Sequence, residues 1–233
     1  MPSATYLERR SQLQTYFDRT AAEAWSLLTS DAPVSRIRAT VRAGRDRMRT
    51  TLLSWLPDDL RGARLLDAGC GTGALSVEAA QRGADVVAID VAPTLIALAQ
   101  QRMPENLGSG RIDFRAGDML DPALGDFDFV VAMDSLIHYR AADCVNALAS
   151  LSSRTGGAIL FTFAPRTPAL ALMHAAGRLF PRSERAPAIQ PVAPKELAAR
   201  IRDDAALAHW PIAQTVRIVN GFYTSQAMEL RRT

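Results

Sequence analysis

Short apolar runs alternate with amphipathic segments through the middle of the chain, and this alternation predicts the fold. We expect strands near residues 64–69, 85–90, 111–116, 127–132 and 157–163. We expect helices in the segments between them, near residues 73–82, 93–102 and 141–153. Strands that are separated by helices pair in parallel and are joined by right-handed crossovers. The pattern therefore predicts an α/β domain built on a mostly parallel sheet.

The chain before this domain has a helical pattern. Leu7 to Phe17 reads as one helix, residues 21–28 as a second, and residues 36–56 as a third with apolar positions at helical spacing. We expect residues 1–56 to form a helical N-terminal arm in front of a domain that spans residues 57–233. Such an arm either covers a ligand or packs on the sheet, and we favour packing for the third helix.

The chain after the fifth expected strand changes character. Residues 164–194 are rich in proline around one apolar helix, Ala169 to Leu179. Long connections of this kind are often functional covers, so we expect a lid insertion over about residues 164–206. Beyond it, Asn220-Gly221 separates two apolar-rich runs, which is a strong signal for a β-hairpin. We therefore expect the sheet to end in two antiparallel strands.

The most informative stretch is residues 64–90, where a strand, a glycine-rich turn, a helix and a second strand follow one another. Gly69, Gly71 and Gly73 lie in the turn, where glycine permits positive φ and lets a ligand approach the backbone. The helix that follows offers unpaired N–H groups at its N-terminus. Asp90 ends the second strand, where an acid can accept both hydroxyls of a ribose. This stretch therefore predicts a site for a nucleoside-like cofactor.

Two classes of cofactor fit such a turn. Gly69, Gly71 and Ala74 satisfy the dinucleotide fingerprint, which would place a nicotinamide or flavin nucleotide here. Asp67 argues against that class, because an acid that faces the turn repels a pyrophosphate and suits an ammonium group. The stretch from Asp67 to Gly73 resembles motif I of the class I S-adenosylmethionine methyltransferases, whose acid and turn backbone hold the methionine part. An antiparallel end to a Rossmann-like sheet also fits that class.

The resemblance implies further cofactor contacts at the ends of successive strands. The segment that starts at Gly117 matches the position where the superfamily recognises adenine, and Met133 to Ser135 leave the fourth strand. The carboxyl ends of parallel strands line the ligand crevice. The complete set of expected cofactor-binding residues is Asp67, Gly69, Gly71, Thr72, Gly73, Asp90, Val91, Gly117, Asp118, Met119, Met133, Asp134 and Ser135.

A narrower resemblance spans the whole chain. Residues 134–139, and residues 16–20 together with Trp25, resemble the magnesium-protoporphyrin IX O-methyltransferase family of chlorophyll and bacteriochlorophyll biosynthesis. Residues 41–45 and 221–226 also resemble segments of that family, whereas the insertion cannot be matched residue by residue. The resemblance implies transfer of a methyl group from S-adenosylmethionine to a propionate carboxylate of Mg-protoporphyrin IX. The products would be the monomethyl ester and S-adenosylhomocysteine.

The same resemblance implies that Tyr16 and His138 are the functionally important tyrosine and histidine. A carboxylate is already ionised at neutral pH, so we expect both side chains to orient the reactants rather than to accept a proton. We expect Trp25, Arg166 and Arg178 to bind the porphyrin. The magnesium chelatase large subunit is the implied partner that hands the porphyrin over.

Composition narrows the remaining choices. The net charge of +3 is too small to indicate nucleic-acid binding, and two cysteines with three scattered histidines predict no disulfide framework and no metal site. No transmembrane helix or signal peptide is expected, which favours a cytoplasmic protein that contacts at most the surface of the photosynthetic membrane. Two alternatives stay open: methylation of another small acceptor such as a quinone or phenol, and a non-catalytic, cofactor-binding regulatory module.

Overall fold

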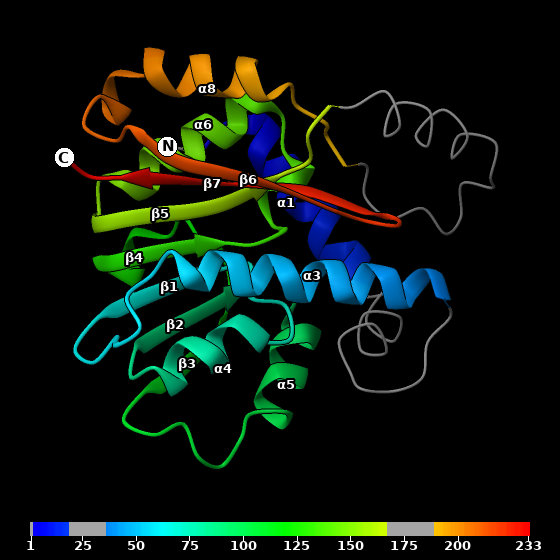
Figure 1. Cartoon of the computed structure of the whole chain (residues 1–233), viewed down its shortest axis with the longest axis vertical. Helices are drawn as coiled ribbons and strands as arrows, with labels where there is room; N and C mark the ends of the chain where they lie inside the picture. Colours follow the sequence, from blue (N-terminus) through cyan, green and yellow to red (C-terminus); the bar gives the residue numbers. More distant parts are fainter. Residues whose placement is uncertain (1, 19–35, 167–188) are drawn as a thin grey trace.

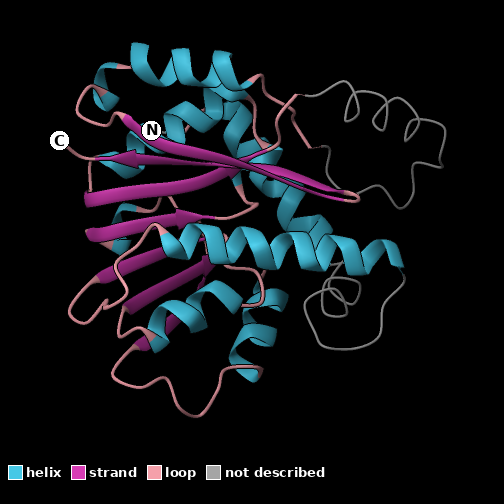
Figure 2. Cartoon of the chain, viewed as in Figure 1, coloured by secondary structure: helices cyan, strands magenta, loops and turns pink. Residues whose placement is uncertain are grey.

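A seven-stranded sheet forms the centre of the computed structural model, which describes residues 2–18, 36–166 and 189–233 (Figure 1, Figure 2). The parallel strands are β1 (Arg64–Ala68), β2 (Asp85–Asp90), β3 (Arg111–Ala116), β4 (Phe127–Ala132) and β5 (Thr155–Phe163). The antiparallel strands are β6 (Ile212–Asn220) and β7 (Tyr223–Arg231). The strand order is β3-β2-β1-β4-β5-β7-β6. The expected α/β fold with a mostly parallel sheet and an antiparallel end is therefore confirmed.

Helices cover both faces of this sheet (Figure 1). One face carries α3 (Arg36–Ser54), α4 (Ala74–Gln81) and α5 (Pro93–Gln101). The other face carries α1 (Ala4–Tyr16), α6 (Ala141–Ser152) and α8 (Pro194–Asp203). Successive side chains of a strand point to opposite faces, so Leu65 packs into the core beneath α3 and α4 while Leu66 packs into the core beneath α6.

Two helices differ from the expected pattern. The first begins at Ala4 rather than near Leu7, because the hydroxyl of Ser3 caps it by accepting from the Tyr6 N–H at 3.1 Å. The helix α8 was not predicted within the proline-rich stretch, where Pro194 occupies its first turn and Leu197 is buried. Proline has no N–H to lose at that position, so it starts a helix there rather than breaking one.

Several expectations lie outside the described residues, namely the helices near residues 21–28 and 169–179. Three short 3₁₀ helices complete the described chain: η2 (Pro122–Leu124), η3 (Leu136–His138) and η5 (Ala205–Leu207). No helix in the described ranges is long and apolar enough to cross a membrane.

The fold brings the N-terminal helix, α3 and the β6–β7 hairpin close to the carboxyl ends of the parallel strands (Figure 1).

Candidate active site

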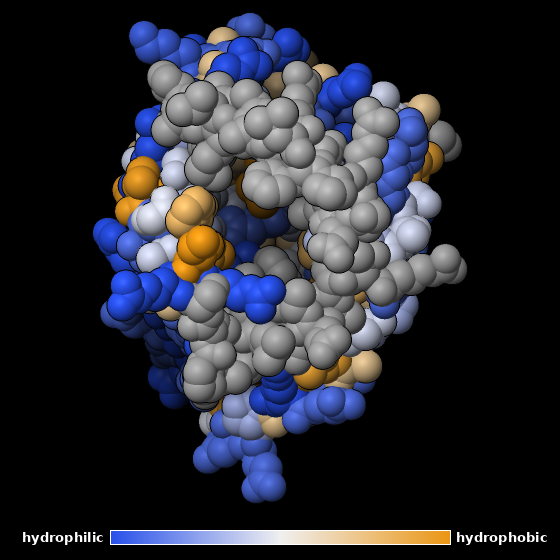
Figure 3. Space-filling model, turned by 90° about the vertical axis from the view of Figure 1, so that its right-hand side faces the viewer, coloured by the Kyte–Doolittle hydropathy of each residue, from blue (hydrophilic) through white to orange (hydrophobic). Residues whose placement is uncertain are grey.

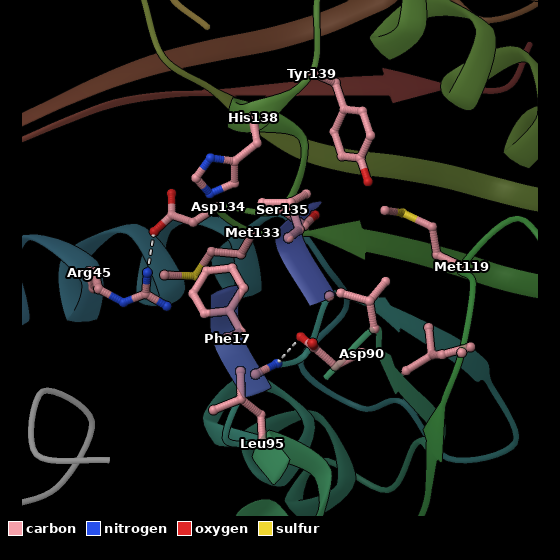
Figure 4. Close-up of a pocket in the computed structure, with 16 residues that line it drawn as sticks. Phe17, Arg45, Asp90, Leu95, Met119, Met133, Asp134, Ser135, His138 and Tyr139 are labelled. Atoms are coloured by element: carbon pink, nitrogen blue, oxygen red, sulfur yellow. Dashed lines mark hydrogen bonds and ion pairs between the residues drawn. The ribbon is translucent and has the colours of Figure 1, made fainter. Parts of the chain in front are cut away.

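A pocket opens at the carboxyl ends of the parallel strands, and its empty space is about 620 Å³ including the open mouth. Figure 3 faces this end of the sheet and shows a hollow with hydrophilic and hydrophobic side chains on its wall. The residues that line it are Leu13, Phe17, Arg45, Gly69, Gly71, Ile89, Asp90, Val91, Leu95, Gly117, Met119, Met133, Asp134, Ser135, His138 and Tyr139 (Figure 4).

The glycine-rich turn forms one wall, and its glycines are required by backbone geometry. Gly69, Gly71 and Gly73 have φ values of 87°, 55° and 79°. A Cβ on Gly69 would lie only 2.4 Å from the Cβ of Ser135. The N–H of Gly69 donates to the carbonyl of Ile89 at 2.8 Å, which fixes the turn against β2. The turn therefore presents bare backbone to the pocket.

Asp90 enters the pocket from the end of β2, as the sequence predicts. Its carboxylate accepts hydrogen bonds from the Gly71 N–H at 2.9 Å and from the Ala92 N–H at 3.0 Å. Burial raises the pKa of Asp90, although these backbone donors lower it. The carboxylate thus has a fixed orientation beside the turn.

Asp67 does not line this pocket. Its side chain is 1% exposed beneath the turn, where it accepts a hydrogen bond from the Ser76 hydroxyl at 2.6 Å. Burial raises the pKa of Asp67 to about 7, against a smaller lowering by the Ser76 hydrogen bond. The acid is therefore placed to stabilise the turn, and its direct contact with a ligand stays a prediction.

Asp134 follows β4 and has a positive φ of 54°. Among the described residues, only glycines share a positive φ with it. Its carboxylate accepts from Arg45 Nη1 at 2.7 Å and from the Tyr223 hydroxyl at 3.1 Å. Its backbone N–H donates to Thr162 Oγ1 at 2.7 Å. Donors from α3, β5 and β7 therefore hold this one residue.

The carboxylate of Asp118 is also bound by side chains of the protein. Its carboxylate accepts from the Tyr6 hydroxyl at 2.7 Å and from Arg10 Nη1 at 2.5 Å, and both donors belong to α1. The ring of Tyr6 stacks on Tyr139 with a centroid separation of 4.8 Å. These contacts hold α1 across the end of the sheet, so that Leu13 closes one side of the pocket.

His138 lies in η3, the short helix that follows β4, and is 9% exposed. Its ring meets Phe17 edge-on at 6.3 Å between centroids. Tyr16 does not line the pocket but packs edge-on against Phe17 at 5.2 Å, and partial burial raises its pKa. The two residues predicted to act on the reactants therefore both contact the ring of Phe17.

The chain matches a known family along its whole length. It is 50% identical to the magnesium-protoporphyrin O-methyltransferase of Rhodobacter capsulatus over 99% of this chain and 100% of that one. The family profile described as magnesium-protoporphyrin IX methyltransferase C-terminus matches residues 132–232, and a general methyltransferase-domain profile matches residues 65–155. The chain belongs to the magnesium-protoporphyrin O-methyltransferase family.

Solved structures agree with this membership. The crystal structure of magnesium protoporphyrin IX methyltransferase from Synechocystis PCC 6803 with bound SAH aligns with a TM-score of 0.83 at 27% identity. The alignment covers 96% of this chain and all of that one. The fold is therefore that of the class I methyltransferases, as predicted. A more distant relative, the ubiquinone biosynthesis O-methyltransferase of Xanthomonas oryzae, is 33% identical over 72% of this chain and 71% of that one.

The structure brings most of the predicted site residues of this family member together. Those that line the pocket are Gly69, Gly71, Asp90, Val91, Gly117, Met119, Met133, Asp134, Ser135 and His138. Those that lie outside its lining are Tyr16, Asp67, Thr72, Gly73 and Asp118. Arg166 is exposed, and Trp25 and Arg178 lie outside the described residues.

Sequence reasoning missed six lining residues: Leu13, Phe17, Arg45, Ile89, Leu95 and Tyr139. Phe17 and Arg45 belong to segments that resemble the family, so their sequence context carried a signal although no role was attached to it. Leu13 and Leu95 are ordinary apolar positions of helices, which nothing local marks as part of a site.

Proposed function

We propose that this protein transfers a methyl group from S-adenosylmethionine to a propionate carboxylate of Mg-protoporphyrin IX. The products are the monomethyl ester and S-adenosylhomocysteine, and the step belongs to chlorophyll or bacteriochlorophyll biosynthesis. The observation that carries this proposal is the 50% identity to the Rhodobacter capsulatus enzyme over the full length of both chains.

The pocket suits the cofactor. Gly69 lets the side chain of Ser135 pack directly against the turn, and Ser135 Oγ has no hydrogen-bond partner among the described residues. We propose that Asp90 accepts the ribose hydroxyls and that Gly117 and Met119 border the adenine. When bound, S-adenosylmethionine supplies an electrophilic methyl group on its sulfonium.

The remaining cofactor assignments concern the backbone and the acids around the pocket. Thr72, Gly73 and Val91 belong to the turn and to the exit from β2, and we propose that they shape the backbone around the ligand. Asp67 supports this turn from below. Asp118 can meet adenine only by sharing its carboxylate with Tyr6 and Arg10.

The chemistry requires positioning more than proton transfer. A propionate is ionised at neutral pH, so no side chain has to remove a proton from it. We propose that His138 orients the acceptor at the pocket wall and that Tyr16 supports it through Phe17. A loss of more than about 10⁴-fold in kcat for His138→Asn, with unchanged ligand binding, would exceed the usual contribution of a general acid–base group and would contradict this modest role.

We propose that the chain divides into an N-terminal arm, residues 1–56, and a methyltransferase domain, residues 57–233. The arm and the lid insertion, about residues 164–206, are the proposed covers of the site. Leu13 and Phe17 of the arm line the pocket. The roots of the insertion pair with each other, since the Arg166 N–H donates to the Val192 carbonyl at 2.8 Å. The Gln190 N–H also donates at 2.8 Å to the carbonyl of Ile137, the residue before His138. Residues 166 and 190–192 of the insertion therefore lie at the rim of the site.

Contacts with the porphyrin follow from this placement. Arg166 stands at the root of the insertion, and we propose that it meets a propionate together with Arg178, while Trp25 meets the macrocycle. Loss of porphyrin affinity in Arg166→Ala and Arg178→Ala, with intact cofactor affinity, would support this assignment. Unchanged porphyrin affinity would remove it.

Peripheral contact with an anionic membrane surface is a further part of the proposal. Ile37, Val219 and Phe222 are exposed apolar side chains near the hairpin turn, and the chain carries a net charge of +3. Co-sedimentation with anionic but not neutral vesicles would support it. Hand-over from the magnesium chelatase large subunit is proposed from the family resemblance alone, and direct binding between the purified proteins tests it.

The decisive experiment incubates the purified protein with methyl-labelled S-adenosylmethionine and either Mg-protoporphyrin IX or a phenolic quinone precursor. The second acceptor is included because a relative is named as a ubiquinone biosynthesis O-methyltransferase. Label in the porphyrin monomethyl ester supports the proposal. Label only in the phenol would replace the acceptor, and binding of the cofactor without transfer to either would favour a regulatory module.

A further inference from the structure

Two segments that resemble the family, residues 41–45 and 221–226, have no role at the pocket in the proposal so far. The structure brings them together at the pocket. Arg45 comes from α3, Tyr223 from the start of β7, and both reach Asp134 at the end of β4. Figure 4 shows the Arg45 guanidinium bound to Asp134 and directed toward Met133 and Phe17.

The carboxylate of Asp134 is surrounded by protein donors. Besides Arg45 at 2.7 Å, both of its oxygens accept from the Tyr223 hydroxyl at 3.1 Å. The hydroxyls of Thr162 and Ser225 donate at 3.2 and 3.3 Å. A carboxylate has about four lone-pair sites, and these donors use them. Asp134 is therefore placed to hold Arg45, and its expected contact with the cofactor stays a prediction.

Gly44 explains why Tyr223 can reach this position. A Cβ on Gly44 would lie 2.5 Å from Cδ1 of Tyr223 and 2.8 Å from its Cβ and Cγ. The tyrosine ring therefore rests directly on the backbone of α3. A glycine inside a helix costs about 1 kcal/mol relative to alanine, so this close approach is retained against helix propensity. Burial raises the pKa of Tyr223, which keeps its hydroxyl protonated as a donor to Asp134.

This arrangement fixes the direction of the Arg45 guanidinium at the pocket wall, because Asp134 binds it. The side chain of Arg45 is 21% exposed. Its five N–H donors form a planar fork, and that geometry lets one guanidinium hold a first carboxylate while it donates to a second. Hydrogen bonds between guanidinium and carboxylate are among the strongest in proteins.

We propose that Arg45 is a carboxylate-binding residue of the pocket, and that Gly44, Tyr223 and Asp134 are the positioning residues that hold it. The inference rests on the proposed function, in which both reactants carry a carboxylate: the methionine part of S-adenosylmethionine and the propionates of the porphyrin. The shared chemistry is one carboxylate against one guanidinium, and the experiment separates the two sources.

The test measures binding of ligand pairs that differ in their free carboxylates. For the cofactor, S-adenosylhomocysteine is compared with methylthioadenosine, which lacks the amino-acid part. For the acceptor, Mg-protoporphyrin IX is compared with its dimethyl ester. Arg45→Gln is expected to weaken only the carboxylate-bearing member of one pair, by about 10- to 100-fold, as charged hydrogen bonds predict. The pair that responds identifies the source of the carboxylate.

Three variants complete the design. Arg45→Lys keeps the charge and is expected to restore part of the affinity. Tyr223→Phe removes only the hydroxyl and is expected to weaken the same ligand by a smaller factor, raising its KM or Kd more than it lowers kcat. Arg49→Gln is the matched control, because Arg49 lies on the same helix but pairs with Asp46 and Glu78 outside the pocket.

Two results would overturn the proposal: affinities within twofold of wild type for all ligands in Arg45→Gln, or equal losses for both members of each pair. Circular dichroism confirms that each variant is folded. If the wild type fails to methylate Mg-protoporphyrin IX, the proposed function fails. The comparison of S-adenosylhomocysteine with methylthioadenosine still decides whether Arg45 binds the carboxylate of the cofactor.

Discussion

Replacing Asp67 by asparagine is expected to remove a pH-dependent part of the stability. The carboxyl of Asp67 is 1% exposed, and burial raises its pKa to about 7. The same carboxyl in the unfolded chain titrates near its ordinary value of 3.8. Between these two values the unfolded chain has released the proton while the folded protein still holds it.

The sign of the effect follows from this difference in bound protons. Because the folded state binds more protons, the free energy of unfolding falls as the pH rises through this window. The stabilisation is fully present below the unfolded pKa and is lost above the folded one. At 1.36 kcal/mol per pKa unit, this group should remove about 2–3 kcal/mol between pH 5 and pH 8. Carboxylates in ordinary salt bridges have the opposite dependence.

Urea unfolding of the wild type and of Asp67→Asn at several pH values measures this term. Asparagine keeps a side-chain oxygen for the Ser76 hydroxyl, so the hydrogen bond is retained while the titration is lost. The free energy of unfolding of the wild type minus that of Asp67→Asn should fall by about 2–3 kcal/mol between pH 5 and pH 8, and all other titrating groups cancel to first order. Parallel curves would refute the raised pKa and with it the account of this buried acid.

Three further predictions address the pocket and its cover. Gly69→Ala should lower the free energy of unfolding by more than Gly62→Ala does. Both glycines have positive φ (87° and 77°), but only a Cβ on Gly69 would meet another atom within 4 Å. Equal losses in urea unfolding would leave backbone strain as the whole cause. Asp90→Asn should weaken S-adenosylhomocysteine binding by about 10-fold or more in calorimetric titration, and a change within twofold would exclude this carboxylate from the ribose contact. Tyr6→Phe keeps the ring stack on Tyr139 but removes the hydroxyl that donates to Asp118. It should therefore lower the free energy of unfolding by about 1.5–3 kcal/mol. No change would show that this hydrogen bond does not hold α1 in place.

The core of the fold was accessible from sequence because its signals are local. Four of the parallel strands are mostly buried runs, whereas the edge strand β3 alternates between intermediate and exposed positions. The helices between the strands have their own spacing, so the positions of both follow from neighbouring residues. The hairpin was equally local, since Asn220-Gly221 marks the turn, and Gly221 has a φ of 56°. The helix α8 was missed because the proline-rich stretch and the residues after it were assigned to a lid insertion, although Pro194 begins the helix.

The pocket was only partly accessible, because part of its wall comes from distant segments. The glycine turn and Asp90 lie within one strand–turn–helix–strand unit and could be identified together. Arg45 is positioned by a contact with Asp134, 89 residues further along the chain. No spacing rule connects two such positions, and only the resemblance of residues 41–45 to a family segment marked the first of them.

The acids at the strand ends show what separates a predicted ligand contact from a structural one. Sequence reasoning assigned Asp67, Asp90, Asp118 and Asp134 to the cofactor from their positions near the carboxyl ends of parallel strands and from the resemblance to class I methyltransferases. In the structure Asp90 and Asp134 both lie in the pocket lining. Asp90 accepts from local backbone donors, whereas the other three hold a turn, the helix α1, or α3 with β7. Because these partners come from the elements that surround the pocket, the acids fasten the walls of the site to the ends of the strands. Position along the strand predicts where an acid lies, but its function depends on which donors the rest of the chain brings to it.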